Sequence, residues 1–299
     1  MTGKSTMQDF RPEPGNLVGE GLWGRVYDLG DGTVLKLARE HCAGIGNGRE
    51  KVRREFEALT DLARLEQLDG LVPKAVETGE VAPESPLAAE GFAVWLRTER
   101  LEGLSLSIPA VESAAPQRRR RMGESIGRTL AALHRAFGEL GRGGSTRTDG
   151  SDPYADLKAA VAGNRFYLDA IAALELERRK IPPESLRICH NDYNVSNLLF
   201  AGDRVCGILD FAEWGLGYPE KDISDIAGEI PDLEAPVIEA YEQASGLNVD
   251  RRRLTLGKAE NALYGAVISE REGDAEGVRF ERDGLVALLR ELGYPLAAR

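Results

Sequence analysis

The sequence predicts an α+β protein in two parts, an N-terminal antiparallel sheet with one helix and a mainly helical part after it. Three observations predict this class. Short alternating runs separated by glycine turns lead up to residue 38, as in antiparallel strands. From Gln117 onward, apolar residues recur every three or four positions, which is the spacing of amphipathic helices. Within the helical part, apolar runs at 197–200 and 205–209 flank a short turn and predict a β-hairpin.

The chain begins with a segment at residues 3–6, Gly-Lys-Ser-Thr, that imitates the end of a phosphate-binding P-loop. A P-loop needs an upstream strand and a further glycine before this motif, and the sequence offers neither. We therefore expect a flexible tail here. The same end lacks the apolar core of a secretion signal.

A glycine-rich turn comes next. Gly19, Gly21 and Gly24 match the pattern G-x-G-x-x-G, with Val26 two positions further on. The alternation continues to residue 38, so strands flank this turn on both sides. This context excludes a dinucleotide-binding βαβ unit, in which a helix must follow the glycines. It favours a glycine hairpin whose backbone N–H groups approach phosphate oxygens, because no Cβ is in the way.

Lys36 lies in the middle of the strand V-L-K-L, where an apolar residue is otherwise expected. Residues 49–68 then have the apolar spacing of a helix. Two further strands are predicted at 73–78 and 91–101, with a proline-rich turn at 82–87 between them. We expect these strands to complete the N-terminal sheet.

The remaining segments predict helices. The helix that begins near Gln117 contains His134 beside its apolar stripe, which favours a structural histidine over a catalytic base. Further helices are predicted over 153–180 and 223–299. The segment 141–152 is rich in Gly, Ser and Thr, and is either a lid or a simple connector.

Polar residues flank the predicted β-hairpin at one end. His190 and Asp192 precede it, Asn197 opens its first strand, and Asp210 follows its second strand 13 residues later. Because a hairpin returns the chain to its starting point, we expect these side chains to face one space. Carboxylate and amide oxygens are the ligands that Mg²⁺ prefers. The alternative is a set of ordinary turn residues, which explains any one of them but not the ordered set.

The spacing His190-x-Asp192-x₄-Asn197, followed by Asp210-Phe211, resembles the catalytic and metal loops of the protein-kinase-like superfamily. Its details are most similar to the aminoglycoside phosphotransferase and choline kinase-like family, which phosphorylates small molecules. The resemblance covers roughly residues 17–227.

This resemblance implies a bilobal protein-kinase-like fold. The nucleotide-binding lobe, residues 1–98, would have a five-stranded antiparallel sheet and one helix, and residues 99–103 would form a hinge. The catalytic and substrate-binding lobe, residues 104–299, would be mainly helical around a catalytic β-hairpin. It would include a helical insert at about 151–186 and C-terminal helices at 223–299.

The resemblance also implies the roles of the loop residues. Asp192 would accept the proton of the attacking hydroxyl. Asn197 and Asp210 would hold Mg²⁺ between the nucleotide phosphates. The residues that would support the catalytic loop are His190 and Asp222, with Asp225 as a second candidate for the same task.

On the nucleotide side, Lys36 would bind the α- and β-phosphates and pair with Glu55. Glu57 is the competing partner, but two residues away it lies on a different face of the helix. Thr98 would lie beside the adenine, whose edge the backbone of the next residues would read. The implied nucleotide-binding residues are Gly19, Gly21, Gly24, Val26, Lys36, Glu55, Thr98, Glu99 and Leu101.

The chain departs from the family's H-G-D motif at one position, and its glycine-rich turn is more similar to that of protein kinases than to that of most antibiotic kinases. Asn191 stands where the family has glycine in H-G-D, and we expect its side chain to contact the edge of the substrate. Asp210 and Asp222 are only 12 residues apart, which leaves no room for the activation segment of a protein kinase. We therefore expect Mg²⁺-dependent transfer of the γ-phosphoryl group of ATP or GTP to a hydroxyl of a small molecule. The alternatives are a protein Ser/Thr kinase and a non-catalytic pseudokinase that only binds nucleotide.

Composition narrows the partners. A net charge of −11 argues against a nucleic-acid partner, which needs clustered Lys and Arg. No run approaches the roughly 18 apolar residues of a membrane span. The three cysteines form no C-x-x-C pair, so we expect a reducing cytoplasm. The oligomeric state stays open.

The stretch 222–250 contains eight acidic residues and no Lys or Arg. Beside an active site, such a face would concentrate a cationic acceptor such as an aminoglycoside or an amino alcohol. The alternative is a solvated helical face without a role in binding.

Overall fold

The computed structural model describes residues 5–7, 13–21, 23–41, 47–140 and 152–296. The chain divides into two compact units. The N-terminal unit comprises Met1–Gly103 together with Gly207–Glu213, and the C-terminal unit comprises Leu104–Cys206 and Trp214–Arg299. Residues 141–151, where we expected a lid or connector, lie outside the described residues.

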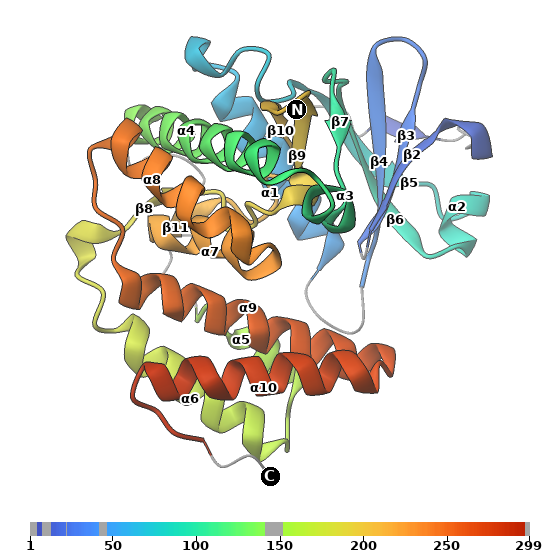
Figure 1. Cartoon of the computed structure of the whole chain (residues 1–299). Helices are drawn as coiled ribbons and strands as arrows, with labels where there is room; N and C mark the ends of the chain where they lie inside the picture. The colour runs from blue at the N-terminus through green and yellow to red at the C-terminus, as the bar shows by residue number, and fades with distance from the viewer. Residues whose placement is uncertain (1–4, 8–12, 22, 42–46, 141–151, 297–299) are drawn as a thin grey trace. The chain divides into compact units, whose positions relative to one another are not determined.

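A six-stranded sheet forms the N-terminal unit, with the strand order β1-β5-β6-β4-β3-β2 (Figure 1). Its strands are β1 (Ser5–Met7), β2 (Leu17–Gly21), β3 (Gly24–Asp28), β4 (Thr33–Arg39), β5 (Ala75–Val81) and β6 (Phe92–Glu99). Strands β2 to β6 pair antiparallel, which confirms the five predicted strands.

The sixth strand was not predicted. Ser5–Met7 pairs in parallel with Gly79–Val81 of β5, so the expectation of a flexible tail is wrong for Ser5 and Thr6. Edge pairing uses backbone groups alone and leaves no alternating apolar pattern to detect in so short a segment. Gly3 and Lys4 lie outside the described residues.

The strand β4 has two different faces. Leu35 and Leu37 are fully buried in the apolar core of the sheet, together with Tyr27 and Trp95. Successive side chains point to opposite faces of a strand, so Lys36 lies on the other face. This alternation delivers one lysine to the site described below.

The helix α1 (Gly48–Leu62) packs against β4, β5 and β6. It begins at Asn47, whose side chain accepts hydrogen bonds from the N–H groups of Arg49 and Glu50. The predicted helix was too long at its C-terminal end, because α1 stops at Leu62 and a short 3-10 turn covers Glu66–Leu68. A second short helix, α2 (Pro86–Ala89), occupies the end of the expected proline-rich turn.

Helices dominate the C-terminal unit (Figure 1). They are α3 (Ile108–Glu112), α4 (Pro116–Leu140), α5 (Ala155–Ala160), α6 (Arg165–Arg178), α7 (Pro219–Glu229), α8 (Glu234–Ser245), α9 (Arg251–Glu272) and α10 (Ala275–Glu291). The long helix α4 packs along α8, and α9 packs between α10 and α7. Among the described residues, no helix combines the length and apolar character of a membrane span.

The predicted β-hairpin is confirmed. Its strands are β9 (Leu198–Ala201) and β10 (Arg204–Ile208), and the short strand β7 (Leu104–Ser105) pairs with β9. A second small sheet pairs β8 (Arg187–Cys189) antiparallel with β11 (Gly215–Gly217). The loop between β8 and β9 carries the motif residues His190 to Asn197.

Glu177 of α6 contacts α9 and the C-terminal segment. Ionisation of its carboxyl group should make the stability of the fold depend on pH. Its carboxylate accepts hydrogen bonds from Arg252, Lys180 and Tyr294. Burial alone would raise the pKa of Glu177, but these three partners lower it from 4.5 to about 2. One pKa unit corresponds to about 1.4 kcal/mol, so the ionised carboxylate stabilises the fold at neutral pH by about 3 kcal/mol.

Because the folded pKa is depressed, this stabilisation is present above the unfolded value and is lost as the pH falls from about 4.5 to about 2. We expect Glu177→Gln to lower the free energy of unfolding at pH 7 and to approach the wild type at pH 3. Urea denaturation at both pH values measures this. A stability difference that does not change with pH would contradict the assignment.

Candidate active site

Lys36 is the centre of the polar cluster in the N-terminal unit. Its Nζ lies 2.7 Å from Oε2 of Glu55 on α1 and 3.0 Å from Oδ2 of Asp210. Glu57 instead pairs with Arg53 on the outer face of the helix, at 2.6 Å. The structure thus brings Lys36, Glu55 and Asp210 together and leaves Glu57 apart.

The charges of this cluster support each other. Burial alone would lower the pKa of Lys36, but the negative charges of Asp210 and Glu55 raise it above its usual value. Burial raises the pKa of Glu55, which the ammonium of Lys36 opposes. Lys36 is therefore a fixed positive charge at neutral pH, which suits an anionic ligand such as a phosphate.

The segment Gly207–Glu213 belongs to the N-terminal unit, where it contacts α1 and the carbonyl of Leu71. The N–H group of Phe211 donates a hydrogen bond to Glu55, and Lys51 and Glu213 form an ion pair. Between these contacts, Asp210 has a φ of 61°, a left-handed conformation that is rare for residues other than glycine. Backbone strain of this kind persists where the surroundings hold the residue in place, and it is common at functional sites.

The three motif glycines differ in what requires them. A Cβ at Gly24 would lie 1.8 Å from the carbonyl oxygen of Leu37, so packing of β3 against β4 excludes any side chain there. A Cβ at Gly21 would meet nothing within 4 Å. Gly19 and Val26 face each other across β2 and β3 as paired residues. Of the three, only Gly24 is thus required by packing, and the space around Gly21 is open.

One residue that lies within this turn was not selected from the sequence. Trp23 lies between Gly21 and Gly24, and the ammonium group of Lys51 lies 4.6 Å from the centre of its ring. Since Lys51 also pairs with Glu213, one α1 lysine contacts both the glycine turn and the segment that contains Asp210. The presence of a tryptophan within a glycine-rich turn could have drawn attention to this position.

The remaining predicted nucleotide-binding residues lie at the end of β6. Thr98 is buried, whereas Glu99 is exposed and donates its backbone N–H to the carbonyl of Lys74. Leu101 follows the strand and is half-buried. All three lie in the N-terminal unit with Lys36.

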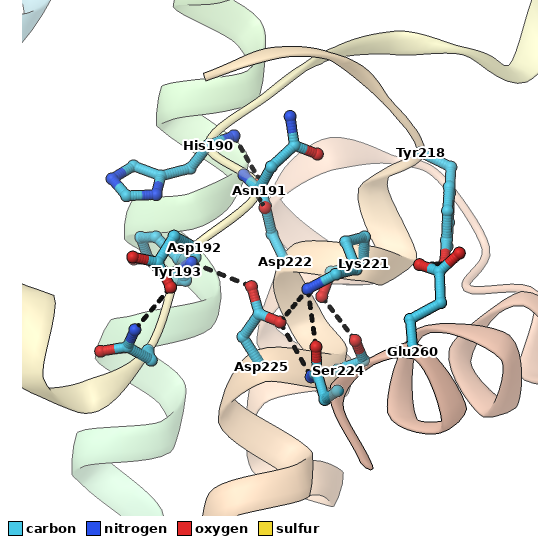
Figure 2. Close-up of polar contacts among 12 residues, drawn as sticks. His190, Asn191, Asp192, Tyr193, Tyr218, Lys221, Asp222, Ser224, Asp225 and Glu260 are labelled. Atoms are coloured by element: carbon cyan, nitrogen blue, oxygen red, sulfur yellow. Dashed lines mark hydrogen bonds and ion pairs between the residues drawn. The ribbon is translucent and has the colours of Figure 1, made fainter. Parts of the chain in front are cut away.

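In the C-terminal unit, Asp222 at the start of α7 supports the loop that follows β8. Its fully buried carboxylate accepts hydrogen bonds from the N–H groups of His190 at 2.9 Å and Asn191 at 2.6 Å (Figure 2). Burial alone would raise the pKa of Asp222, but the hydrogen bond from the His134 imidazole and the interactions with His190 lower it. His134 lies 2.8 Å from Asp222 and 3.0 Å from Tyr241, so it is a structural core histidine.

Two asparagines orient the carboxylate of Asp192. The Nδ2 of Asn197 donates to Oδ2 of Asp192 at 3.0 Å, and the Nδ2 of Asn194 donates to Oδ1 at 2.8 Å. The hydrogen bond from Nδ2 to Asp192 holds the side-chain amide of Asn197 in one orientation. Asn194 was missed, although an asparagine three residues before Asn197 is a typical cap, and its Oδ1 does accept from the Asn197 N–H.

Comparison with known proteins identifies the family of this chain. A model of the phosphotransferase enzyme family matches residues 16–256. The chain belongs to this family. It is a phosphotransferase. No curated protein sequence matches this phosphotransferase.

Solved structures show the same fold. The GDP complex of wild-type aminoglycoside 2'-phosphotransferase-IIIa matches with a TM-score of 0.64 and 15% identity, over 92% of each chain. A thermostable mutant of aminoglycoside phosphotransferase APH(4)-Ia matches with a TM-score of 0.60 and 16% identity, over 92% of this chain and 93% of that one. A choline/ethanolamine kinase family protein from Mesorhizobium loti matches with a TM-score of 0.59 and 20% identity, over 91% and 86%. The protein-kinase-like fold predicted from the sequence is confirmed.

Asn191 of the phosphotransferase takes the place of the family glycine in a left-handed backbone conformation. Asn191 has a φ of 64°, a conformation that glycine adopts freely and asparagine tolerates better than most residues. Its side chain, which we expected at the substrate edge, lies against β11 and donates to the carbonyl of Gly215 at 3.3 Å. A Cβ at Gly217 would lie 2.4 Å from Oδ1 of Asn191.

This contact predicts a pair of mutually compensating substitutions. Gly217→Ala should destabilise the phosphotransferase by about 1–3 kcal/mol through overpacking against Asn191. The double variant Asn191→Gly/Gly217→Ala removes the clashing oxygen and should recover most of that loss. Thermal unfolding of the wild type, both single variants and the double variant measures the coupling. Strictly additive effects would show that the two side chains do not compete for this space.

Proposed function

We propose that this phosphotransferase moves the γ-phosphoryl group of ATP or GTP, with Mg²⁺, to a hydroxyl of a small molecule. The observation that carries the proposal is Lys36, whose ammonium group is paired with both Glu55 and Asp210. A lysine held in this way is ready for the α- and β-phosphates of a nucleotide. Membership of the phosphotransferase enzyme family supports the same reaction.

The nucleotide would bind to the N-terminal unit. Lys36 would bind its phosphates, and the backbone of the glycine turn would lie over them. Thr98 would lie beside the base, and the backbone of Glu99 and Leu101 would read the base edge. Glu55 would keep Lys36 in place. The likeness to a GDP complex of aminoglycoside 2'-phosphotransferase-IIIa supports a nucleotide donor.

Asp210 and Asn197 would hold a magnesium ion. A carboxylate from Asp210 and the amide oxygen of Asn197 are hard oxygens of the kind that Mg²⁺ binds while it keeps waters and phosphate oxygens as its other ligands. When bound, the ion supplies neutralisation of the charge on the phosphate oxygens. Replacement of Asp210 or Asn197 should therefore remove metal-dependent turnover.

Asp192 would accept the proton of the attacking hydroxyl. Its two carboxylate oxygens are oriented by Asn194 and Asn197, and the loop that carries it is held by Asp222. His190 would support the loop from within the core, where it is fully buried. Phosphoryl transfer leaves the protein mainly the tasks of positioning and charge neutralisation, and this loop is built for positioning.

Two of the similar structures support a proposal for the acceptor class. One is a complex of an aminoglycoside phosphotransferase, APH(2")-IIIa, with GDP and kanamycin, and another is a choline/ethanolamine kinase family protein. Aminoglycosides and amino alcohols share a hydroxyl and a cationic amine. We propose an acceptor with the same two groups.

An ADP- and GDP-release screen tests the function. The protein is incubated with ATP or GTP and Mg²⁺, and each hydroxylated amine is compared with its deoxy analogue. Release that is stimulated by a hydroxylated compound and not by its deoxy analogue supports the proposal. Phosphorylation of added protein, or thermal stabilisation by nucleotide without any release, would favour a protein kinase or a pseudokinase instead.

A further inference from the structure

One face of α7 carries three carboxylates beside the catalytic loop. Asp222, Asp225 and Glu229 are spaced by three and four residues, which places them along one side of the helix. All three accept hydrogen bonds from backbone N–H groups of the loop. The donors are His190 and Asn191 for Asp222, Tyr193 for Asp225 at 3.0 Å, and Val195 for Glu229 at 3.2 Å.

These bonds reach both ends of the functional segment. Tyr193 directly follows Asp192, and Val195 precedes Asn197 by two residues. Hydrogen bonds from an N–H group to an ionised carboxylate are stronger and shorter than those to neutral acceptors. Asp225 and Glu229 therefore restrain the backbone next to the proposed base and next to the proposed metal ligand.

Asp225 is itself tied to the rest of the unit. It is buried and forms an ion pair with Lys221 (Figure 2). It also accepts a hydrogen bond from Asn261 of α9 at 2.9 Å. Lys221 also donates to Asn261 at 2.9 Å. Contacts from α7 and α9 thus fix the carboxylate of Asp225, and its hydrogen bond with the Tyr193 N–H lies in the protein interior.

The acidic stretch 222–250 consequently has two kinds of members. Asp222, Asp225 and Glu229 face inward and hold the loop. The sequence indicated this role for Asp222, offered Asp225 as a second candidate for it, and did not indicate it for Glu229. Glu239 faces outward, with 60% of its side chain exposed, and pairs only at the surface with Arg120. Glu239 can therefore serve as an exposed control for substitutions of the acidic residues that hold the loop.

We propose that Asp225 and Glu229 are positioning residues for phosphoryl transfer, which set the backbone of the loop between Asp192 and Asn197. This inference rests on the proposed function, because it depends on the roles of Asp192 as the base and Asn197 as a metal ligand. The geometric part, a carboxylate that protects a loop amide, does not depend on any activity.

Glu229 offers the sharper test, since it is only half-buried and its replacement should leave the protein folded. Glu229→Ala removes the acceptor, and Glu229→Gln keeps an oxygen for the Val195 N–H. We expect Glu229→Ala to lower kcat by about ten- to a hundredfold with little change in the KM for nucleotide, since small misplacements of reacting groups have effects of this size. Glu229→Gln should recover most of kcat, and the control Glu239→Ala should match the wild type.

Hydrogen exchange supplies a readout that needs no turnover. Amides in residues 190–197 should exchange faster in Glu229→Ala and Asp225→Asn than in the wild type, and at the wild-type rate in Glu239→Ala. Wild-type exchange and wild-type kcat in Glu229→Ala would overturn the proposal. So would equal, salt-dependent increases in the KM of a cationic acceptor in Glu229→Ala and Glu239→Ala, because these would show that the acids attract the substrate. Faster exchange in an enzyme that phosphorylates no acceptor would uphold the loop contact and reject the proposed function.

Discussion

Asp192→Ala is expected to lower kcat by about a thousandfold while the affinity for nucleotide stays at the wild-type level, since a positioned general base contributes about 10²–10⁴ in rate. The reason is local. Asn194 and Asn197 orient both oxygens of this carboxylate, and no other carboxylate is bound by these two amides in the described part of the chain. The nucleotide contacts proposed for the N-terminal unit do not involve Asp192. Steady-state kinetics and nucleotide titration by calorimetry separate the two effects.

Asp203→Ala is the matched control for this substitution. Asp203 lies in the turn of the same β-hairpin and pairs with Arg118 and Arg121 near the surface. Its removal takes away one negative charge without touching the loop, so kcat should not change. If Asp192→Ala kept more than about a tenth of the wild-type kcat, its role as the base would be excluded.

Asp222→Ala is expected to have the largest effect on stability, a loss of about 3–5 kcal/mol in the free energy of unfolding, because it leaves buried donors without their acceptor. These donors are the N–H groups of His190 and Asn191 and the imidazole of His134. A loss of this size is a large part of the 5–15 kcal/mol of a typical domain. Urea denaturation followed by circular dichroism measures it.

Asp232→Ala provides the comparison. The side chain of Asp232 is 69% exposed and pairs with Arg119 at 3.0 Å, and such surface pairs contribute about 1 kcal/mol or less. If both aspartate variants lost the same small amount of stability, the buried network around Asp222 would be energetically unimportant and its support of the loop would be disproved.

The sequence predicted those features that depend on local spacing. The alternation around Lys36, the apolar stripe of α4 and the turn between β9 and β10 are each visible within about ten residues. Helical geometry also distinguished Glu55 from Glu57, since only one of them shares the buried face of α1. The match between pattern and structure is good wherever the next neighbours in the chain decide the conformation.

Features that depend on contacts between distant segments were missed. The grouping of Gly207–Glu213 with the N-terminal unit comes from contacts with α1, about 150 residues earlier in the chain. Gly24 is required by the backbone of β4 and not by a phosphate alone. Asp225 was only a second candidate beside Asp222, and Glu229 was expected only as a member of the acidic stretch, because sequence does not show which acids of a helix face a loop 30 residues away.

The transfer of labelled γ-phosphate from ATP or GTP tests the central claim most directly. The wild type and Asp192→Ala are incubated with the labelled nucleotide, Mg²⁺ and the acceptor that stimulates release, and the products are separated by mass. We predict that the wild type places the label on the acceptor as a phosphate ester and that Asp192→Ala does not. Label found only in inorganic phosphate or in protein would contradict the account.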